Sequence, residues 1–179
     1  MTDNESSTTL PRHLQPEFDL REALLEEALL FVQGAADIPG IIRLAMIGSL
    51  LTPKRRPKDC DLVVSVTEEV EMARLAKLGR RLKGRTGAMG SGADVFVCDA
   101  EHRYIGRICQ WRECWPRRLC QARNCGLRPG LNDDLDVVNL GPDQTLTPPV
   151  ELFPTVITRT DVPEDVQRVL LGRLLAQEE

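Results

Sequence analysis

The stretch LAMIGSLLTPKRRPKDCDLVV, residues 44–64, decides the fold, because two apolar segments flank a polar and basic loop. The first segment starts with IIR at residue 41 and stops at Gly48; it is short and β-branched at its start, which predicts a buried strand. The second segment, CDLVVSV, begins at Cys60 and predicts another strand. Gly48-Ser49 therefore closes one strand and Asp59-Cys60-Asp61 opens the next.

The segments on either side of this stretch predict helices and a third strand. A helix is expected from Asp19, a plausible N-cap, to a stop at Gly34. Residues 67–83 predict a second helix, with acids in its first turns and bases in its last. Residues 93–99, ADVFVCD, read as a strand. The order helix, strand, loop, strand, helix, strand predicts an α/β fold with a small mixed sheet flanked by helices.

Beyond Glu101 the periodic pattern is lost. We expect an irregular segment that is rich in Arg and Cys over 102–130, a short strand over 135–140, and a terminal amphipathic helix over 161–177. The predicted organisation is a disordered arm (1–16), a main domain with the Cys-rich segment (17–145), and a C-terminal linker and helix that packs on the same domain (146–179).

Composition limits the classes of protein to be considered. A chain of 179 residues with 42% apolar residues fits one domain and excludes a large multidomain enzyme. The net charge of −4 argues against a dedicated nucleic-acid binder. Residues 52–131, however, contain 17 bases and 9 acids, so a basic middle encloses a few isolated acids. This distribution indicates an anionic ligand such as a phosphate.

The sequence predicts a cytoplasmic protein without membrane segments. It has neither a run of about 18 apolar residues nor the basic start and apolar stretch of a secretion signal. Its six cysteines are therefore expected to be reduced thiols or metal ligands rather than disulfides.

Three aspartates carry the strongest chemical signal. Asp59 and Asp61 are two positions apart in a strand, so both side chains project to one face while Cys60 points to the other. Asp94 begins a later strand and would lie beside that pair if the strands are neighbours. Carboxylates held close together favour a hard cation such as Mg²⁺. Gly48 would allow the backbone to approach a phosphate, and Ser49 would add a hydroxyl and an amide donor.

This constellation resembles the polymerase-beta-like nucleotidyltransferase superfamily, whose signature is an apolar strand, Gly-Ser, about nine to thirteen residues and then Asp-x-Asp. The resemblance covers residues 38–99. It implies that Gly48 and Ser49 hold the triphosphate and that Asp59 and Asp61 bind two Mg²⁺ ions. It also implies that Asp94 binds one ion and activates the acceptor hydroxyl.

The expected activity is Mg²⁺-dependent transfer of a nucleoside monophosphate from a triphosphate to an unidentified hydroxyl acceptor. That acceptor is expected to be a partner protein or a nucleic acid. A partner protein is suggested because small members of the superfamily resemble antitoxins that modify a helical toxin. The loop residues Lys54 and Arg55, with Arg56 and Lys58, would guide the triphosphate or a nucleic-acid acceptor, although a charged loop is also ordinary solvated surface.

Four cysteines form the second signal. Cys109, Cys114, Cys120 and Cys125 lie within seventeen residues. Four thiolates would satisfy a tetrahedral structural Zn²⁺, whereas free cysteines are usually buried small residues. The same segment interleaves arginines with two tryptophans. The alternative function is therefore a non-catalytic, zinc-bearing module on the same fold that binds nucleic acid or protein.

Overall fold

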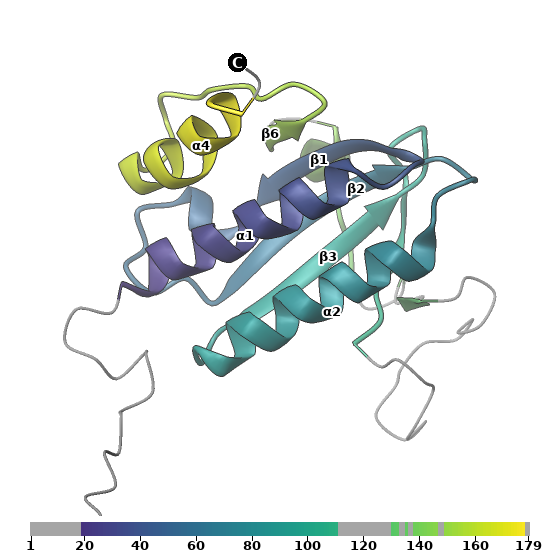
Figure 1. Ribbon diagram of the computed structural model, residues 1–179, viewed down its shortest axis with the longest axis horizontal. Helices are drawn as coiled ribbons and strands as arrows, with labels where there is room; N and C mark the ends of the chain where they lie inside the picture. The colour runs from purple at the N-terminus through teal and green to yellow at the C-terminus, as the bar shows by residue number, and fades with distance from the viewer. Residues whose placement is uncertain (1–18, 111–129, 133–134, 136–137, 147–148, 178–179) are drawn as a thin grey trace, which may run out of the picture.

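The computed structural model of the protein describes residues 19–110, 130–132, 135, 138–146 and 149–177 (Figure 1). This part of the chain forms one six-stranded mixed sheet in the order β5-β4-β3-β2-β1-β6. The strands are β1 (Ile41–Ile47), β2 (Asp59–Val66), β3 (Gly92–Cys98), β4 (Tyr104–Ile108), β5 (Leu131–Asn132) and β6 (Val150–Phe153). The helical elements are α1 (Leu20–Ala36), η2 (Ser49–Leu51), α2 (Met72–Ala88), α3 (Pro142–Thr145), η4 (Val166–Leu171) and α4 (Gly172–Leu175). The prediction of an α/β fold with a mixed sheet is confirmed.

One pair of neighbouring strands in the sheet is parallel. β2 and β3 run in the same direction and are joined through α2, whereas β1 pairs antiparallel with both β2 and β6. On the far side, β4 pairs antiparallel with β3 and with β5. A parallel pair needs a long crossover connection, and the helix between β2 and β3 supplies it.

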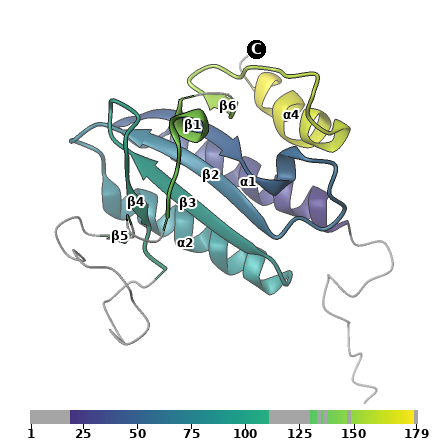
Figure 2. The same ribbon diagram turned by 180° about the vertical axis from the view of Figure 1, so that it is seen from behind.

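The two faces of the sheet are covered differently. α1 and α2 pack on one face, and the terminal helix formed by η4 and α4 packs beside α1 (Figure 1). The main core lies between these helices and the sheet and is built mostly from Leu, Val, Ile and Ala. The opposite face, which Figure 2 shows turned toward the viewer, carries a smaller apolar cluster. Val138 and Leu140 pack against this cluster. The cluster consists of Ile47, Val63, Phe96 and Cys98.

The predicted N-cap of α1 is confirmed, but several helix ends differ from the prediction. The Asp19 carboxylate accepts hydrogen bonds from the amides of Arg21 and Glu22, as an N-cap does. The helix then continues past Gly34 to Ala36. α2 begins at Met72 instead of Thr67, because residues 67–70 form a turn in which the Val70 amide donates to the Thr67 carbonyl.

Tertiary pairing overrides local sequence in the C-terminal half. The segment expected to be irregular contains β4, which the pairing with β3 stabilises, and the expected linker contains β6, which pairs with β1. The strand expected over 135–140 is wrong at Val138–Leu140, which forms no strand and covers the smaller apolar cluster. The terminal helix is confirmed, but the N-cap of η4 is Asp165, whereas the helix was expected from residue 161.

Within the described ranges, none of the helices combines the length and the hydropathy needed to cross a bilayer.

Candidate functional site

The parallel pairing of β2 with β3 brings two of the predicted carboxylates together. Asp61 is the direct register partner of Asp94, and Asp59 is the partner of Gly92. On its other side, Asp61 lies opposite Ile47, the last residue of β1. The strands are therefore neighbours as expected, and Asp61 lies at the centre of the group.

The alternation of β2 separates the acids from the core. Cys60 and Leu62 belong to the main core beneath the helices, so Asp59 and Asp61 project to the opposite face. Cys60 is fully buried, and this burial, followed by the charges of Asp61, Glu27 and Asp59, raises the pKa of its thiol. Cys60 therefore stays a neutral thiol, on the opposite face of β2 from the two carboxylates.

Two glycines make room for the carboxylates. Gly48 has a φ of 83°, and a Cβ at this position would lie 2.5 Å from Asp61 Oδ2. A Cβ at Gly92 would likewise overlap Asp59 Oδ1. Both positions require glycine, the first because of its backbone conformation and both because an acid occupies the space of a side chain.

Ser49 carries an unused hydroxyl beside this group. Its Oγ is buried and, within the part of the chain that the structure describes, has no hydrogen-bond partner. The Ser49 carbonyl, in contrast, accepts hydrogen bonds from the amide and the hydroxyl of Thr52. Buried hydroxyls are normally paired, so the Ser49 Oγ next to Gly48 is a donor whose partner the described residues do not supply.

Asp61 lies in surroundings that disfavour its charged form. Burial and then the neighbouring charges of Asp59 and Asp94 raise the pKa of Asp61 to about 7, although Arg107 and Lys83 oppose the shift. A cation bound beside Asp61 would relieve the repulsion.

Asp94 differs from the other two acids because it already binds two cations. Lys83 Nζ lies 3.0 Å from its Oδ1, and an Arg107 guanidinium nitrogen lies 3.3 Å from its Oδ2. Across the described ranges, no three His, Cys, Asp or Glu side chains are grouped as ligands of one metal ion. The three carboxylates thus share one face of the sheet, but they do not form a three-ligand cluster.

The carboxylates of Asp59, Asp61 and Asp94 differ in how well they suit a Mg²⁺ ion. The carboxylates of Asp59 and Asp61 lie over glycines, which leaves them space on the sheet face, and hard carboxylate oxygens are the ligands that Mg²⁺ prefers. By their chemistry, Asp59 and Asp61 are the residues that would hold such an ion. Both oxygens of Asp94 already face a cation, so Asp94 does not fit as a further ligand in this arrangement.

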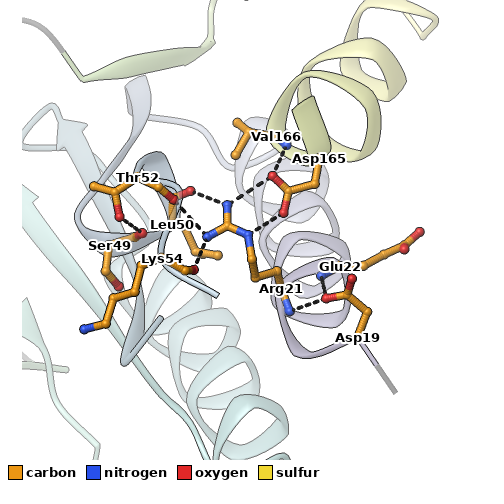
Figure 3. Close-up of polar contacts among 9 residues, drawn as sticks. All are labelled: Asp19, Arg21, Glu22, Ser49, Leu50, Thr52, Lys54, Asp165 and Val166. Atoms are coloured by element: carbon orange, nitrogen blue, oxygen red, sulfur yellow. Dashed lines mark hydrogen bonds and ion pairs between the residues drawn. The ribbon is translucent and has the colours of Figure 1, made fainter. Parts of the chain in front are cut away.

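Arg21 holds the loop that follows Ser49 (Figure 3). Its guanidinium donates to the carbonyls of Leu50, Thr52 and Lys54 and pairs with the Asp165 carboxylate at the start of the terminal helix. Burial alone would raise the pKa of the Asp165 carboxyl. The hydrogen bond and the charge of Arg21 outweigh burial and lower this pKa below its ordinary value. A single buried side chain therefore joins α1, the site loop and the terminal helix.

The basic loop is exposed beside the carboxylates. Lys54, Arg55, Arg56 and Lys58 all lie at the surface, and none is paired with an acid among the described residues. In Figure 3 the ammonium group of Lys54 points away from Arg21, which binds only the carbonyl of that residue. These four side chains are available to an anionic ligand.

The predicted zinc site is only partly covered by the structure. Cys109 is a buried free thiol at the end of β4, and its carbonyl accepts a hydrogen bond from Arg80. Cys114, Cys120 and Cys125 lie outside the described residues, so the zinc hypothesis stays a prediction.

Sequence reasoning missed Lys83, Arg107 and Arg21 as members or supports of the site. Lys83 is one of several bases near the end of α2, and Arg107 is one of several arginines in a segment expected to be irregular. Recognising β4 would have placed Arg107 opposite Phe96, on the face that carries the acids. Arg21 follows the N-cap of a helix, where no local pattern marks it for burial.

Comparison of the chain with protein-family models, with characterised proteins and with solved structures gave no significant match.

Proposed function

We propose that this protein is a nucleotidyltransferase that moves a nucleoside monophosphate from a nucleoside triphosphate to a hydroxyl acceptor, with the help of a divalent cation. One observation carries the proposal: Asp59 and Asp61 share a sheet face directly beside the Gly48-Ser49 turn, with Gly48 packed against the Asp61 carboxylate. The acids that would bind the cation therefore lie next to the turn that would bind the phosphate.

Each part of this arrangement has a role in the proposed reaction. Asp59 and Asp61 would hold Mg²⁺, which when bound polarises the phosphate and neutralises its charge. The free Oγ of Ser49 would donate to a phosphate oxygen, and the positive φ of Gly48 would let the phosphate reach the backbone. The acceptor oxygen would form a bond to the α-phosphorus and pass its proton to solvent water, while the bond between the α-phosphorus and the pyrophosphate oxygen breaks and pyrophosphate leaves.

The basic loop supports an anionic substrate. Four unpaired surface cations, Lys54, Arg55, Arg56 and Lys58, directly precede Asp59 in the chain, so their positive potential extends over the entrance to the acids. This potential attracts a triphosphate, and it also suits the phosphates of a nucleic-acid acceptor. A partner protein is the other candidate acceptor.

A second candidate function is a non-catalytic binding module. The specific observation in its favour is the pairing of Asp94 with Lys83 and Arg107, which neutralises the third acid without a metal ion. In such a module the basic loop would bind phosphates, and the cysteines of the 102–130 segment would hold Zn²⁺.

The two functions are separated by a label-transfer experiment. The full chain is incubated with Mg²⁺, each of the four ribonucleoside triphosphates labelled at the α-phosphate, and the RNA and protein of a cell extract. We expect label to become attached to one macromolecular fraction, which ribonuclease or protease treatment identifies, and EDTA to prevent the attachment.

The control for this experiment is a matched pair of variants. Asp59→Asn should abolish the transfer, whereas Asp37→Asn, an identical change at an exposed carboxylate following α1, should leave it intact. Absence of label with every triphosphate, or label that survives Asp59→Asn, contradicts the transferase and favours the binding module.

A further inference from the structure

Asp165, at the start of the terminal helix, binds Arg21 through both of its carboxylate oxygens (Figure 3). Nε of Arg21 donates to Oδ2 at 2.5 Å, and Nη2 donates to Oδ1 at 3.0 Å. The side chains of Arg21 and Asp165 are 11% and 22% exposed, so water competes little with this pair. A bidentate pair fixes the plane of the guanidinium group as well as its position. Asp165 therefore determines where the other donors of Arg21 point.

The other donors of Arg21 all bind the backbone of the site loop. Nη1 donates to the carbonyls of Thr52 and Lys54, at 3.0 and 2.8 Å, and Nη2 also donates to the Leu50 carbonyl at 2.9 Å. Together with the two bonds to Asp165, these bonds use all five N–H donors of the guanidinium group. A rotation of Arg21 would therefore break three contacts with the loop at once.

The same loop is hydrogen-bonded to the turn that would bind the phosphate. The Leu51 amide donates to the Gly48 carbonyl, and the amide and hydroxyl of Thr52 both donate to the Ser49 carbonyl. Thr52 thus binds the turn with its amide and hydroxyl and binds Arg21 with its own carbonyl. A continuous chain of contacts leads from the terminal helix through Arg21 and Thr52 to the Gly48-Ser49 turn.

We propose that Asp165 is a positioning residue of the nucleotide site, which orients Arg21 so that the site loop and the Gly48-Ser49 turn keep the arrangement that binds the triphosphate. Asp165 touches neither the substrate nor the metal ion and acts only through Arg21. Without its carboxylate, two donors of a largely buried guanidinium group lose their partner, and the group turns toward water and releases the loop. This inference rests on the proposed function, because it concerns how that site is held in place.

Binding of a triphosphate that cannot react tests the inference. The full chain is titrated by calorimetry, in the presence of Mg²⁺, with the α,β-methylene analogue of each of the four ribonucleoside triphosphates, which binds but cannot transfer. For the analogue that the wild type binds best, Asp165→Asn should raise the dissociation constant about tenfold or more, because one misplaced hydrogen bond to a charged phosphate is worth about that factor. Thermal melting establishes that the variant is folded.

Glu22→Gln is the matched control. Glu22 also joins α1 to the terminal helix, through Arg168 at 3.3 Å, but its carboxylate makes no hydrogen bond or ion pair to the described loop residues. This variant should bind the analogue as the wild type does. An unchanged dissociation constant in folded Asp165→Asn, or an equal rise in Glu22→Gln, overturns this inference and leaves the transferase standing. If the wild type binds none of the four analogues, the proposed function itself is overturned.

Hydrogen–deuterium exchange of the wild type gives a second measurement, which needs no variant. Coupling between two sites is reciprocal, so a triphosphate that requires the held loop also stabilises the contact of Asp165 with Arg21. At saturation with the same analogue, we expect the amides of residues 166–174 to exchange about tenfold more slowly, since their exchange follows local opening of the terminal helix. A purely structural role of Asp165 predicts no such protection. If the analogue leaves exchange in this segment unchanged, the inference is wrong.

Discussion

Replacing Arg21 by methionine is expected to lower the free energy of unfolding by about 3 kcal/mol, because it removes one partner of a largely buried ion pair. The Asp165 carboxylate would be left without its cation, and the carbonyls of Leu50, Thr52 and Lys54 would each lose a donor. Urea denaturation followed by circular dichroism measures the loss. The variant Arg21→Lys should retain little of this stability, because an ammonium group cannot match the planar set of donors of the guanidinium group.

The chain offers a matched control for this prediction. Arg168 and Glu22 also join the terminal helix to α1, but their side chains are 61% and 40% exposed. Exposed pairs contribute roughly 0 to 1 kcal/mol, so Arg168→Met should change stability little. Equal losses in the two variants would show that Arg21 is not the residue that holds the site loop.

Replacing Asp61 by asparagine is expected to lower the rate of transfer by at least about 100-fold and at the same time to stabilise the protein above neutral pH. In the proposed transferase, activity falls because Asn removes a carboxylate that would hold the cation. Stability rises because the wild type must ionise an acid whose pKa is raised to about 7 by burial, Asp59 and Asp94. Gain of stability with loss of activity is typical of residues kept for function.

The pH dependence of this effect has a definite sign. The folded pKa of Asp61 lies above the ordinary value of 3.8, so the favourable contribution of the protonated form is complete below that value and is lost as the pH rises through about 7. In EDTA, Asp61→Asn should therefore gain about 2 kcal/mol over the wild type at pH 8 and much less at pH 4.

Asp99→Asn provides the opposite case for comparison. Slight burial raises the pKa of Asp99, but hydrogen bonds from Arg103 outweigh it and lower the pKa. Asparagine at this position should bring no gain at pH 8. Parallel stability curves for Asp61→Asn and the wild type from pH 4 to 8 would contradict the electrostatic description of the site.

The part of the fold that carries the site was predictable because its signals are local. Two apolar segments around Gly48-Ser49 and Asp59-Cys60-Asp61 predicted β1 and β2, and the alternation of β2 predicted which side chains face away from the core. The N-cap at Asp19 was also readable, since its hydrogen bonds are made within one turn.

The remainder depends on contacts between residues far apart in the chain. β4 and β6 are short strands of five and four residues, and their conformation depends on the pairing with β3 and β1. The ion pair between Lys83 and Asp94 joins a helix to the following strand, and the pair between Arg107 and Asp94 joins two strands. The sequence alone could not show which of its many acids is the partner of Lys83 and Arg107.

The site itself stays a prediction, and the structure adds the neighbours and the charges of its residues. Asp94 was expected to lie beside Asp59 and Asp61 if the strands are neighbours, and the structure makes Asp61 and Asp94 register partners. The prediction treated Asp94 as free for a metal ion, whereas it binds two cations. The proposed transferase depends on a divalent ion that binds both Asp59 and Asp61.

Anomalous X-ray scattering from a crystal of the protein with Mn²⁺ and an α,β-methylene triphosphate tests that claim most directly. We expect an anomalous peak between the carboxylates of Asp59 and Asp61, with the triphosphate reaching the Gly48-Ser49 turn. A nucleotide bound elsewhere, or a site beside Asp61 that stays without an anomalous peak at saturating Mn²⁺, would contradict it.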